Sequence, residues 1–331
     1  TAPSTLGGST RITMRGIIKL QNIIKVEDSE VLSLLLMRWY GYTNILKNRN
    51  VRIDEKCRIL TLIFKDHGIN TCILKGQGNS LYYPFPDLRM SGDIDIWVDG
   101  KRDNIINFVR SIGIKVHDIH LVHATAEFFE DVSVELHFTP SWMYNPFHAY
   151  RLNQFFLEQK SFQFQHYDSN VGYTHPNNYF NLVYNIVHIN RHIFDEGIGL
   201  RQIVDYYYIL LASSELEKQK AINELRVLGL EKFTAALMYV MHETLGVSKD
   251  QMLCIPNEKL GNKILVDILD GGNFGKYGRF ANTTSNDQRI KRGIINMRRN
   301  LIFLFDFPEE VLWIPFFKLW HWFWRKVNRY L

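Results

Sequence analysis

Residues 74–100 read LKGQGNSLYYPFPDLRMSGDIDIWVDG, and the segment GDIDIWV within them decides the fold. Asp93 and Asp95 alternate with isoleucines there, a period of two that predicts a β-strand. A strand places residues i and i+2 on the same face, so the two carboxylates lie side by side. Buried carboxylates are costly unless they are paired or bound to a cation. The segment therefore indicates a site that a positive charge completes.

A third carboxylate lies in the later segment VSVELHF (132–138), which also alternates and predicts a strand. If this strand neighbours the first, Glu135 joins Asp93 and Asp95 on one face of the sheet. Three converging carboxylates suit a hard divalent cation, so the sequence predicts a Mg²⁺ or Mn²⁺ site at these residues. Two such ions can clamp the attacking and leaving oxygens of a phosphoryl displacement.

A glycine-rich turn, KGQGNS (75–80), follows the short β-rich run TCILKG and leads into a predicted helix. Backbone N–H groups at such a turn, together with the helix dipole, form an anion site. Arg89, four residues before Asp93, is predicted either to clamp a phosphate or to balance the carboxylates. The residues predicted to hold a nucleotide are Lys75, Gly76, Gly78, Ser80 and Arg89.

The bulk composition describes a folded chain with a mildly basic charge. Apolar residues make up 46% of the 331 residues, which is enough for a sizeable core and argues against disorder. A net charge of +5 suits a ligand that carries phosphate but is far from that of a polybasic nucleic-acid binder. Three scattered cysteines without a CxxC pair predict a reduced, cytoplasmic protein. No uncharged apolar run is long enough to predict a membrane-spanning helix.

Two kinds of pattern divide the chain. Helical spacing of apolar residues predicts helices over 28–47 and 53–67, and short alternating runs predict the strands that follow. Four successive helical runs between residues 176 and 246 predict a helical region, so the fold class is α+β. The predicted division is a disordered arm or cloning remnant over 1–13, a sheet domain with N-terminal helices over 14–147, and a mostly helical domain with an aromatic and basic tail over 148–331.

The ordered set of features resembles the nucleotidyltransferase superfamily with the polymerase-β-like fold. That superfamily has a glycine turn, an acidic pair spaced by one residue on a strand, and a third carboxylate on a later strand. The closer resemblance is to a bacterial family of uncharacterised nucleotidyltransferases, and its C-terminal part extends over 197–210 and 307–315. The motifs that carry it are Lys75-Gly76, Tyr83-Pro84, Arg89, Asp93-Ile94-Asp95 and Glu135-Leu136-His137.

The resemblance implies a mixed sheet with flanking helices as the catalytic domain and a helical C-terminal domain. It implies transfer of a nucleoside monophosphate from an NTP to an acceptor hydroxyl or phosphate, with release of pyrophosphate. Asp93, Asp95 and Glu135 would hold the metal ions, and Glu135 would also help to deprotonate the acceptor. The acceptor stays open among small molecules, sugars, peptides and proteins. The turn KGQGNS departs from the adjacent Gly-Gly or Gly-Ser of the wider superfamily.

Three alternatives to this function remain. One is a toxin-like nucleotidyltransferase that acts on tRNA, against which the mild net charge argues. Another is a nucleotide-binding protein without turnover, against which the retention of three carboxylates argues. The third is an interaction protein that contacts a membrane through residues 308–331.

Two histidines, His188 and His192, lie four residues apart on one face of a predicted helix. Histidines at this spacing bind zinc when a third ligand, here Asp195 or His137, joins them. The other interpretation places one or both in the cleft or in a buried polar network. The sequence leaves both interpretations open.

Arg201 and Asp205 have the same spacing of four residues in LRQIVDYY. One interpretation is an intrahelical ion pair. The other is an arginine that contacts the nucleotide or the acceptor, with Asp205 orienting it.

A different group of residues, His117, His120 and His123, recurs every three residues, a period that suits neither face of a strand, so we predict surface positions.

The C-terminal tail interleaves aromatic with basic residues over 313–329. Such a helix docks its aromatic face on the helical domain, lies on a membrane surface, or stacks on nucleic acid. Docking is the prediction that we favour, with a weak membrane-surface contact through 308–331 as the second.

Overall fold

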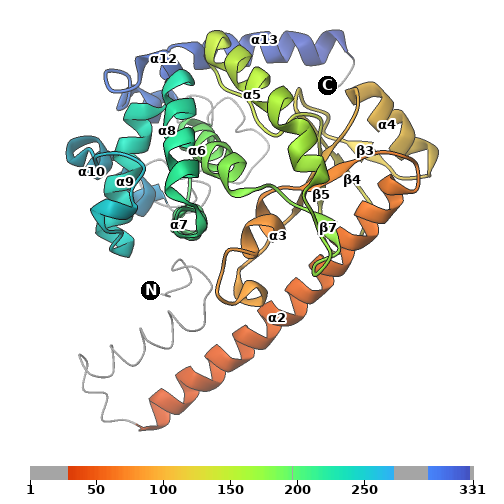
Figure 1. The fold of residues 1–331 in the computed structure, drawn as a ribbon, viewed down its shortest axis with the longest axis horizontal. Coiled ribbons are helices and arrows are strands. Elements are labelled where there is room, and N and C mark those ends of the chain that lie inside the picture. Colours follow the sequence, from red (N-terminus) through yellow and green to blue (C-terminus); the bar gives the residue numbers. More distant parts are fainter. Residues whose placement is uncertain (1–28, 196, 272–296, 329–331) are drawn as a thin grey trace.

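The computed structural model describes residues 29–195, 197–271 and 297–328. Figure 1 shows a mixed sheet at one side of the molecule and a group of helices at the other, with a long helix along the lower edge. The C-terminal helix crosses the opposite edge and runs from the helical side towards the sheet side. The predicted disordered arm over 1–13 lies outside the described residues.

The main sheet has five strands in the order β1-β2-β5-β4-β3. Strands β2 and β5 are parallel, and the other neighbours are antiparallel. The register pairs Asp95 on β2 with Glu135 on β5, so the predicted neighbourhood of these two strands is confirmed. The strands are β1 (Thr71–Ile73), β2 (Ile94–Val98), β3 (Val116–His117), β4 (His123–Ala126) and β5 (Val134–His137).

The first described helix corrects the sequence analysis. Helix α2 (Ser29–Lys65) is one continuous helix, whereas two helices over 28–47 and 53–67 were predicted. The residues between the predicted helices contain neither glycine nor proline. Asn50 in this stretch is buried, and its amide donates to the carbonyl oxygens of Asp87 and Arg89, both at 2.7 Å. A polar residue that finds partners in this way does not need to end the helix.

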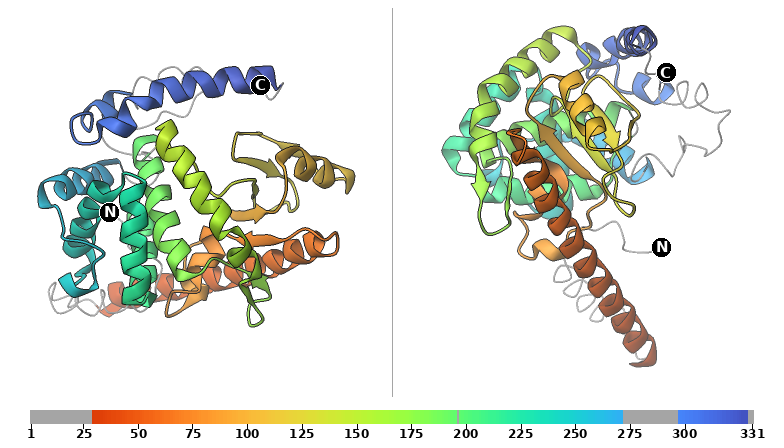
Figure 2. Two further views of the ribbon diagram at one scale, coloured as in Figure 1. Left: turned by 45° about the horizontal axis from the view of Figure 1, so that its top comes forward. Right: turned by 90° about the vertical axis from the view of Figure 1, so that its right-hand side faces the viewer.

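Only the C-terminal half of α2 packs on the sheet. Ile53, Cys57, Leu60 and Phe64 are buried at helical spacing, whereas the first half exposes its apolar side chains. Figure 2 shows this first half projecting from the body of the protein. Helix α4 (Arg102–Ser111) covers the far end of the sheet.

The remaining helices include the four predicted ones, which are α6 to α9. Helices α5 and α10 were not predicted, and Asn145 begins α5 by accepting hydrogen bonds from two backbone N–H groups of the first turn. Two short strands, β6 (Tyr167–Asp168) and β7 (Tyr173–Thr174), form a hairpin between α5 and α6. The helices are α3 (Lys75–Ser80), α5 (Pro146–Gln165), α6 (Asn178–Asp195), α7 (Leu200–Ala212), α8 (Glu215–Val227), α9 (Glu231–Leu245), α10 (Glu258–Gly271), α12 (Pro308–Val311) and α13 (Trp313–Val327), with 3₁₀ turns at Pro86–Leu88 and Lys249–Gln251. No helix of the described ranges is long and apolar enough to cross a membrane.

The sheet and the helices share a hydrophobic core. Trp97 on β2 packs against Phe164 of α5 at 4.8 Å between ring centroids and against Phe180 of α6 at 5.9 Å. The same cluster continues through α7, α8 and α9. Because this core crosses from the sheet into the helices, the division at residues 147 and 148 into two domains stays a prediction.

We expect Trp97→Ala to lower the free energy of unfolding by about 3–5 kcal/mol, because a large buried ring leaves a cavity among aromatic neighbours. Urea unfolding followed by circular dichroism measures the change. Trp322→Ala is the matched control, since Trp322 on α13 is exposed and the chemical change is the same. Equal unfolding midpoints for the two variants would contradict the shared core.

Candidate active site

A pocket of about 320 Å³ lies between the face of the sheet and helices α6 and α7. It gathers residues from six separate parts of the chain, and most of the residues predicted for a site are among them. Its lining consists of Lys75, Gly76, Asn79, Arg89, Gly92, Asp93, Asp95, His123, Glu135, Asn185, His188, Ile189, Arg191, His192, Arg201, Gln202 and Asp205.

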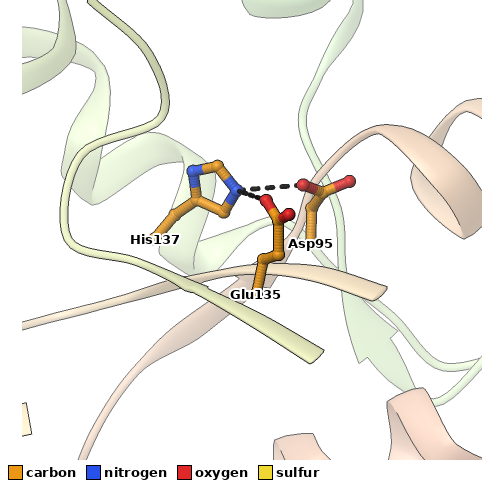
Figure 3. A group of neighbouring side chains, drawn as sticks. All are labelled: Asp95, Glu135 and His137. Atoms are coloured by element: carbon orange, nitrogen blue, oxygen red, sulfur yellow. Dashed lines mark hydrogen bonds and ion pairs between the residues drawn. The ribbon is translucent and has the colours of Figure 1, made fainter. Parts of the chain in front are cut away.

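The carboxylates of Asp95 and Glu135 occupy the centre of the sheet face. Figure 3 shows both side chains turned towards the ring of His137. The Nε2 atom of His137 lies 2.9 Å from Oδ1 of Asp95 and 3.4 Å from Oε2 of Glu135. On the other side, Nζ of Lys75 lies 2.7 Å from the same Asp95 oxygen. Asp95, which is only 3% exposed, is thus held between two groups that can carry positive charge.

These contacts set the protonation of the site. Burial acts to raise the pKa of Asp95, but Lys75 and His137 together lower it below its usual range. Glu135 behaves in the same way, because burial acts to raise its pKa, but the hydrogen bond to His137 and the nearby charges of His123 and Lys75 together lower it. The charge of Asp95, followed by burial, raises the pKa of Asp93. The two central carboxylates are therefore ionised at neutral pH.

The tightest group that could hold a metal ion in the described residues comprises Asp95, Glu135 and His137. One ligand atom from each lies within 4.8 Å of the others. Asp93 comes directly before β2 and lines the same pocket, but it stands outside this group. Two carboxylates with one imidazole are a donor set that fits a divalent cation. His137 was predicted as a cleft residue or as a third zinc ligand beside His188 and His192, and the structure places it with Asp95 and Glu135 instead.

The glycine turn directs only some of its residues to the pocket. Lys75 and Gly76 have positive φ angles of 33° and 20°, a bend that turns the Lys75 ammonium towards Asp95. A Cβ atom on Gly78 would lie 2.6 Å from the carbonyl oxygen of Ile73, so this glycine allows the turn to pack against β1. The hydroxyl of Ser80 donates to the carbonyl oxygen of Gln77. Neither Gly78 nor Ser80 lines the pocket, although both were predicted to hold a nucleotide.

Arg89 forms a buried ion pair with Asp205. Its Nε and Nη2 atoms donate to the two carboxylate oxygens at 2.8 and 2.6 Å, and the hydroxyl of Tyr83 donates to the same carboxylate at 2.5 Å. The interpretation of Arg201 and Asp205 as an intrahelical ion pair is therefore wrong, because the Asp205 carboxylate contacts Arg89 in the loop before β2. Arg201 instead donates to the carbonyl oxygen of Met90 at 3.2 Å.

Helix α6 supplies the opposite wall of the pocket. His188 and His192 both line it, with 4.3 Å between their ring centroids. Burial lowers the pKa of both imidazoles well below its usual range, so they are neutral at neutral pH. The candidate metal group found in the described residues does not include them. Their placement agrees with the cleft interpretation and not with a zinc site.

Several residues that line the pocket were not predicted from the sequence. His123 was predicted at the surface, but it begins β4, pairs in register with His137 and faces the same pocket. The alternation of HATA over 123–126 carried this signal. Asn79 and Asn185, which are hydrogen-bonded to each other at 2.9 Å, carried no such signal because they are 106 residues apart.

The sheet order, the carboxylates on β2 and β5 and the preceding glycine turn agree with the α+β fold predicted for a nucleotidyltransferase, a mixed sheet with flanking helices. The family model described as uncharacterised nucleotidyltransferase matches residues 19–246, and the chain belongs to this family.

Two solved structures are distantly similar to the chain. An antigenic nucleotidyltransferase-like protein from Paracoccidioides brasiliensis is 12% identical, over 63% of this chain and 96% of that chain, with a TM-score of 0.40. The Thermotoga maritima CCA-adding enzyme complexed with tRNA is 12% identical, over 82% of this chain and 80% of that chain, with a TM-score of 0.23. No curated protein sequence matches the chain. Membership of the family, and not these distant similarities, supports transferase activity.

Asp205→Ala is expected to lower the free energy of unfolding by about 3–5 kcal/mol, because it leaves the buried guanidinium of Arg89 without its counter-charge. The double variant Arg89→Met/Asp205→Leu should recover most of this loss. Arg226→Ala, which breaks an exposed ion pair with Glu231, should change stability far less. Urea unfolding measures the stability of each variant. A double variant no more stable than Asp205→Ala would show that the unpaired charge of Arg89 does not cause the loss.

Proposed function

We propose that this protein transfers a nucleoside monophosphate from an NTP to an acceptor hydroxyl or phosphate and releases pyrophosphate. The observation that carries the proposal is the pair of ionised carboxylates, Asp95 and Glu135, in register on adjacent parallel strands at the base of a polar pocket. Membership of the nucleotidyltransferase family supports the reaction class. The acceptor remains open among small molecules, sugars, peptides and proteins, and we propose a cytoplasmic location.

The family implies a divalent cation, Mg²⁺ or Mn²⁺. Asp95, Glu135 and His137 would hold it, with Asp93 as a further carboxylate of the same pocket. When bound, such a cation offsets the charge of the phosphates and orients them for displacement. His137 contacts both central carboxylates, so it positions them even where it does not itself bind the ion.

Side chains around the carboxylates bind the triphosphate, accept a proton and support the pocket wall. Lys75, Arg191 and Arg201 line the pocket and give it positive charge for the triphosphate. Glu135 is half-buried and ionised. We assign it the role of the base that accepts the proton of the acceptor hydroxyl. The buried ion pair of Arg89 with Asp205 fixes α7 against the loop before β2, so Arg89 supports the pocket wall. Positioning and charge stabilisation supply most of the catalysis in this class of reaction.

Asp95→Asn should reduce nucleotide transfer by a factor on the order of 10² or more, because a neutral amide binds a divalent cation poorly and leaves Lys75 without its partner. The measurement is transfer of label from each α-³²P-labelled NTP, with Mg²⁺ or Mn²⁺ and cell extract as the source of acceptor. Asp99→Asn is the matched control, since Asp99 follows the same strand and pairs with Lys160 away from the pocket. Transfer that survives in both Asp93→Asn and Asp95→Asn would rule out the assigned site.

His137→Gln separates two roles of the imidazole. If Nε2 is a metal ligand, the variant should bind Mn²⁺ roughly 10–100-fold more weakly, as measured by electron paramagnetic resonance titration. If instead the protonated imidazole competes with Mn²⁺ for the carboxylates of Asp95 and Glu135, the variant should bind Mn²⁺ more tightly. His123→Gln is the control, because its ring adjoins that of His137 at 5.4 Å without belonging to the ligand group.

A further inference from the structure

One face of helix α13 is docked on the protein, and the opposite face is exposed. Ile314, Phe317, His321 and Trp324 follow helical spacing and are turned inward. Phe317 stacks on Trp142 with 6.3 Å between ring centroids. Figure 2 shows the helix lying along the surface of the body and not buried within it.

These inner contacts reach both parts of the fold. The Trp324 ring packs on the guanidinium of Arg102 in α4, at 4.7 Å. Nζ of Lys318 lies 3.0 Å from a carboxylate oxygen of Asp195 at the end of α6. The inner face of α13 therefore docks on the protein, as the favoured prediction for the tail has it. This docking turns the opposite face of the helix towards solvent.

The second face is a stripe of exposed apolar side chains. Its residues recur at intervals of three and four, which places them on one side of the helix. Phe316 is 65% exposed and Val327 is 79% exposed, whereas Ile314 on the inner face is 6% exposed. The stripe, here called the outer stripe, consists of Phe316, Leu319, Trp320, Phe323 and Val327.

The outer stripe borders an apolar groove of about 640 Å³. Phe316 and Trp320 line the groove from α13, and Tyr150, itself exposed, lines it from α5. Within the described ranges these aromatic side chains remain exposed, so no described element covers them. A contiguous exposed apolar surface of this kind marks a contact site in a folded protein.

A basic residue borders the outer stripe. The ammonium of Lys326 lies over the ring of Trp322 at 5.2 Å, whereas Lys318, which pairs with Asp195, and Arg325 lie on the inner side of the helix. The helix contains no Asp or Glu. Two copies of such a helix would bring like charges together, whereas an anionic surface would offset them.

We propose that α13 lies flat on an anionic membrane surface, with the outer stripe among the acyl chains and Lys326 at the lipid headgroups. Tryptophan favours this interfacial depth, and basic residues attract acidic headgroups. A helix of 15 residues is too short to span a bilayer but long enough to lie in its plane. The proposal does not depend on the proposed transfer reaction.

Vesicle flotation of the full chain tests the proposal. Vesicles of phosphatidylcholine with phosphatidylglycerol should carry the protein upward, and vesicles of phosphatidylcholine alone should carry much less. Phe316→Ser/Phe323→Ser should weaken binding at least about tenfold, because two exposed rings no longer enter the bilayer. Lys326→Glu should weaken binding by roughly fivefold or more, and salt should weaken it further.

Val266→Ser/Leu269→Ser is the matched control, since both residues are exposed apolar side chains on α10. It should bind vesicles like the unchanged chain, and circular dichroism should show that all variants are folded. Absence of flotation with acidic vesicles would overturn the proposal, as would equal binding by the α13 variant and the control. A dimer in light scattering that disappears in the α13 variant, without vesicle binding, would assign the outer stripe to a second copy instead.

Discussion

The buried carboxylate of Asp95 is the constraint around which the site is built. A charge at 3% exposure is tolerable only with close counter-charges, and the fold provides them from two directions. Lys75 reaches it from a turn with positive φ, and His137 reaches it from the neighbouring parallel strand. This glycine turn also requires a glycine at position 78, because a side chain there would collide with β1. The same contacts keep the carboxylate ionised and aimed at the pocket.

The helical side of the pocket depends on two further interactions. Trp97 extends the sheet into the aromatic core of α5 and α6, and the ion pair of Arg89 with Asp205 fastens α7 to the loop before β2. A pocket formed between separate elements needs such fixed walls, because positioning supplies most of the catalysis in phosphoryl transfer. Both walls must therefore be held in place for the pocket to position a substrate.

The C-terminal helix adds a second surface to the molecule. Its inner face contacts α4, the segment before α5 and the end of α6, so it bridges the sheet side and the helical side. Its outer stripe is left to solvent. Internal docking and membrane contact were alternatives in the sequence, but the structure makes them compatible, because they use different faces of one helix.

The sequence by itself determined the strands that carry Asp95 and Glu135 and the four helices α6 to α9. Such features repeat at a period of two or 3.6 residues, so local side-chain spacing reveals them. The tertiary structure alone decided that α2 is continuous, that Arg89 pairs with Asp205, that Gly78 serves packing, and that His137 and His123 face the pocket. These outcomes depend on partners far away in the chain, and a linear pattern holds no information about which distant group will satisfy a buried charge or amide.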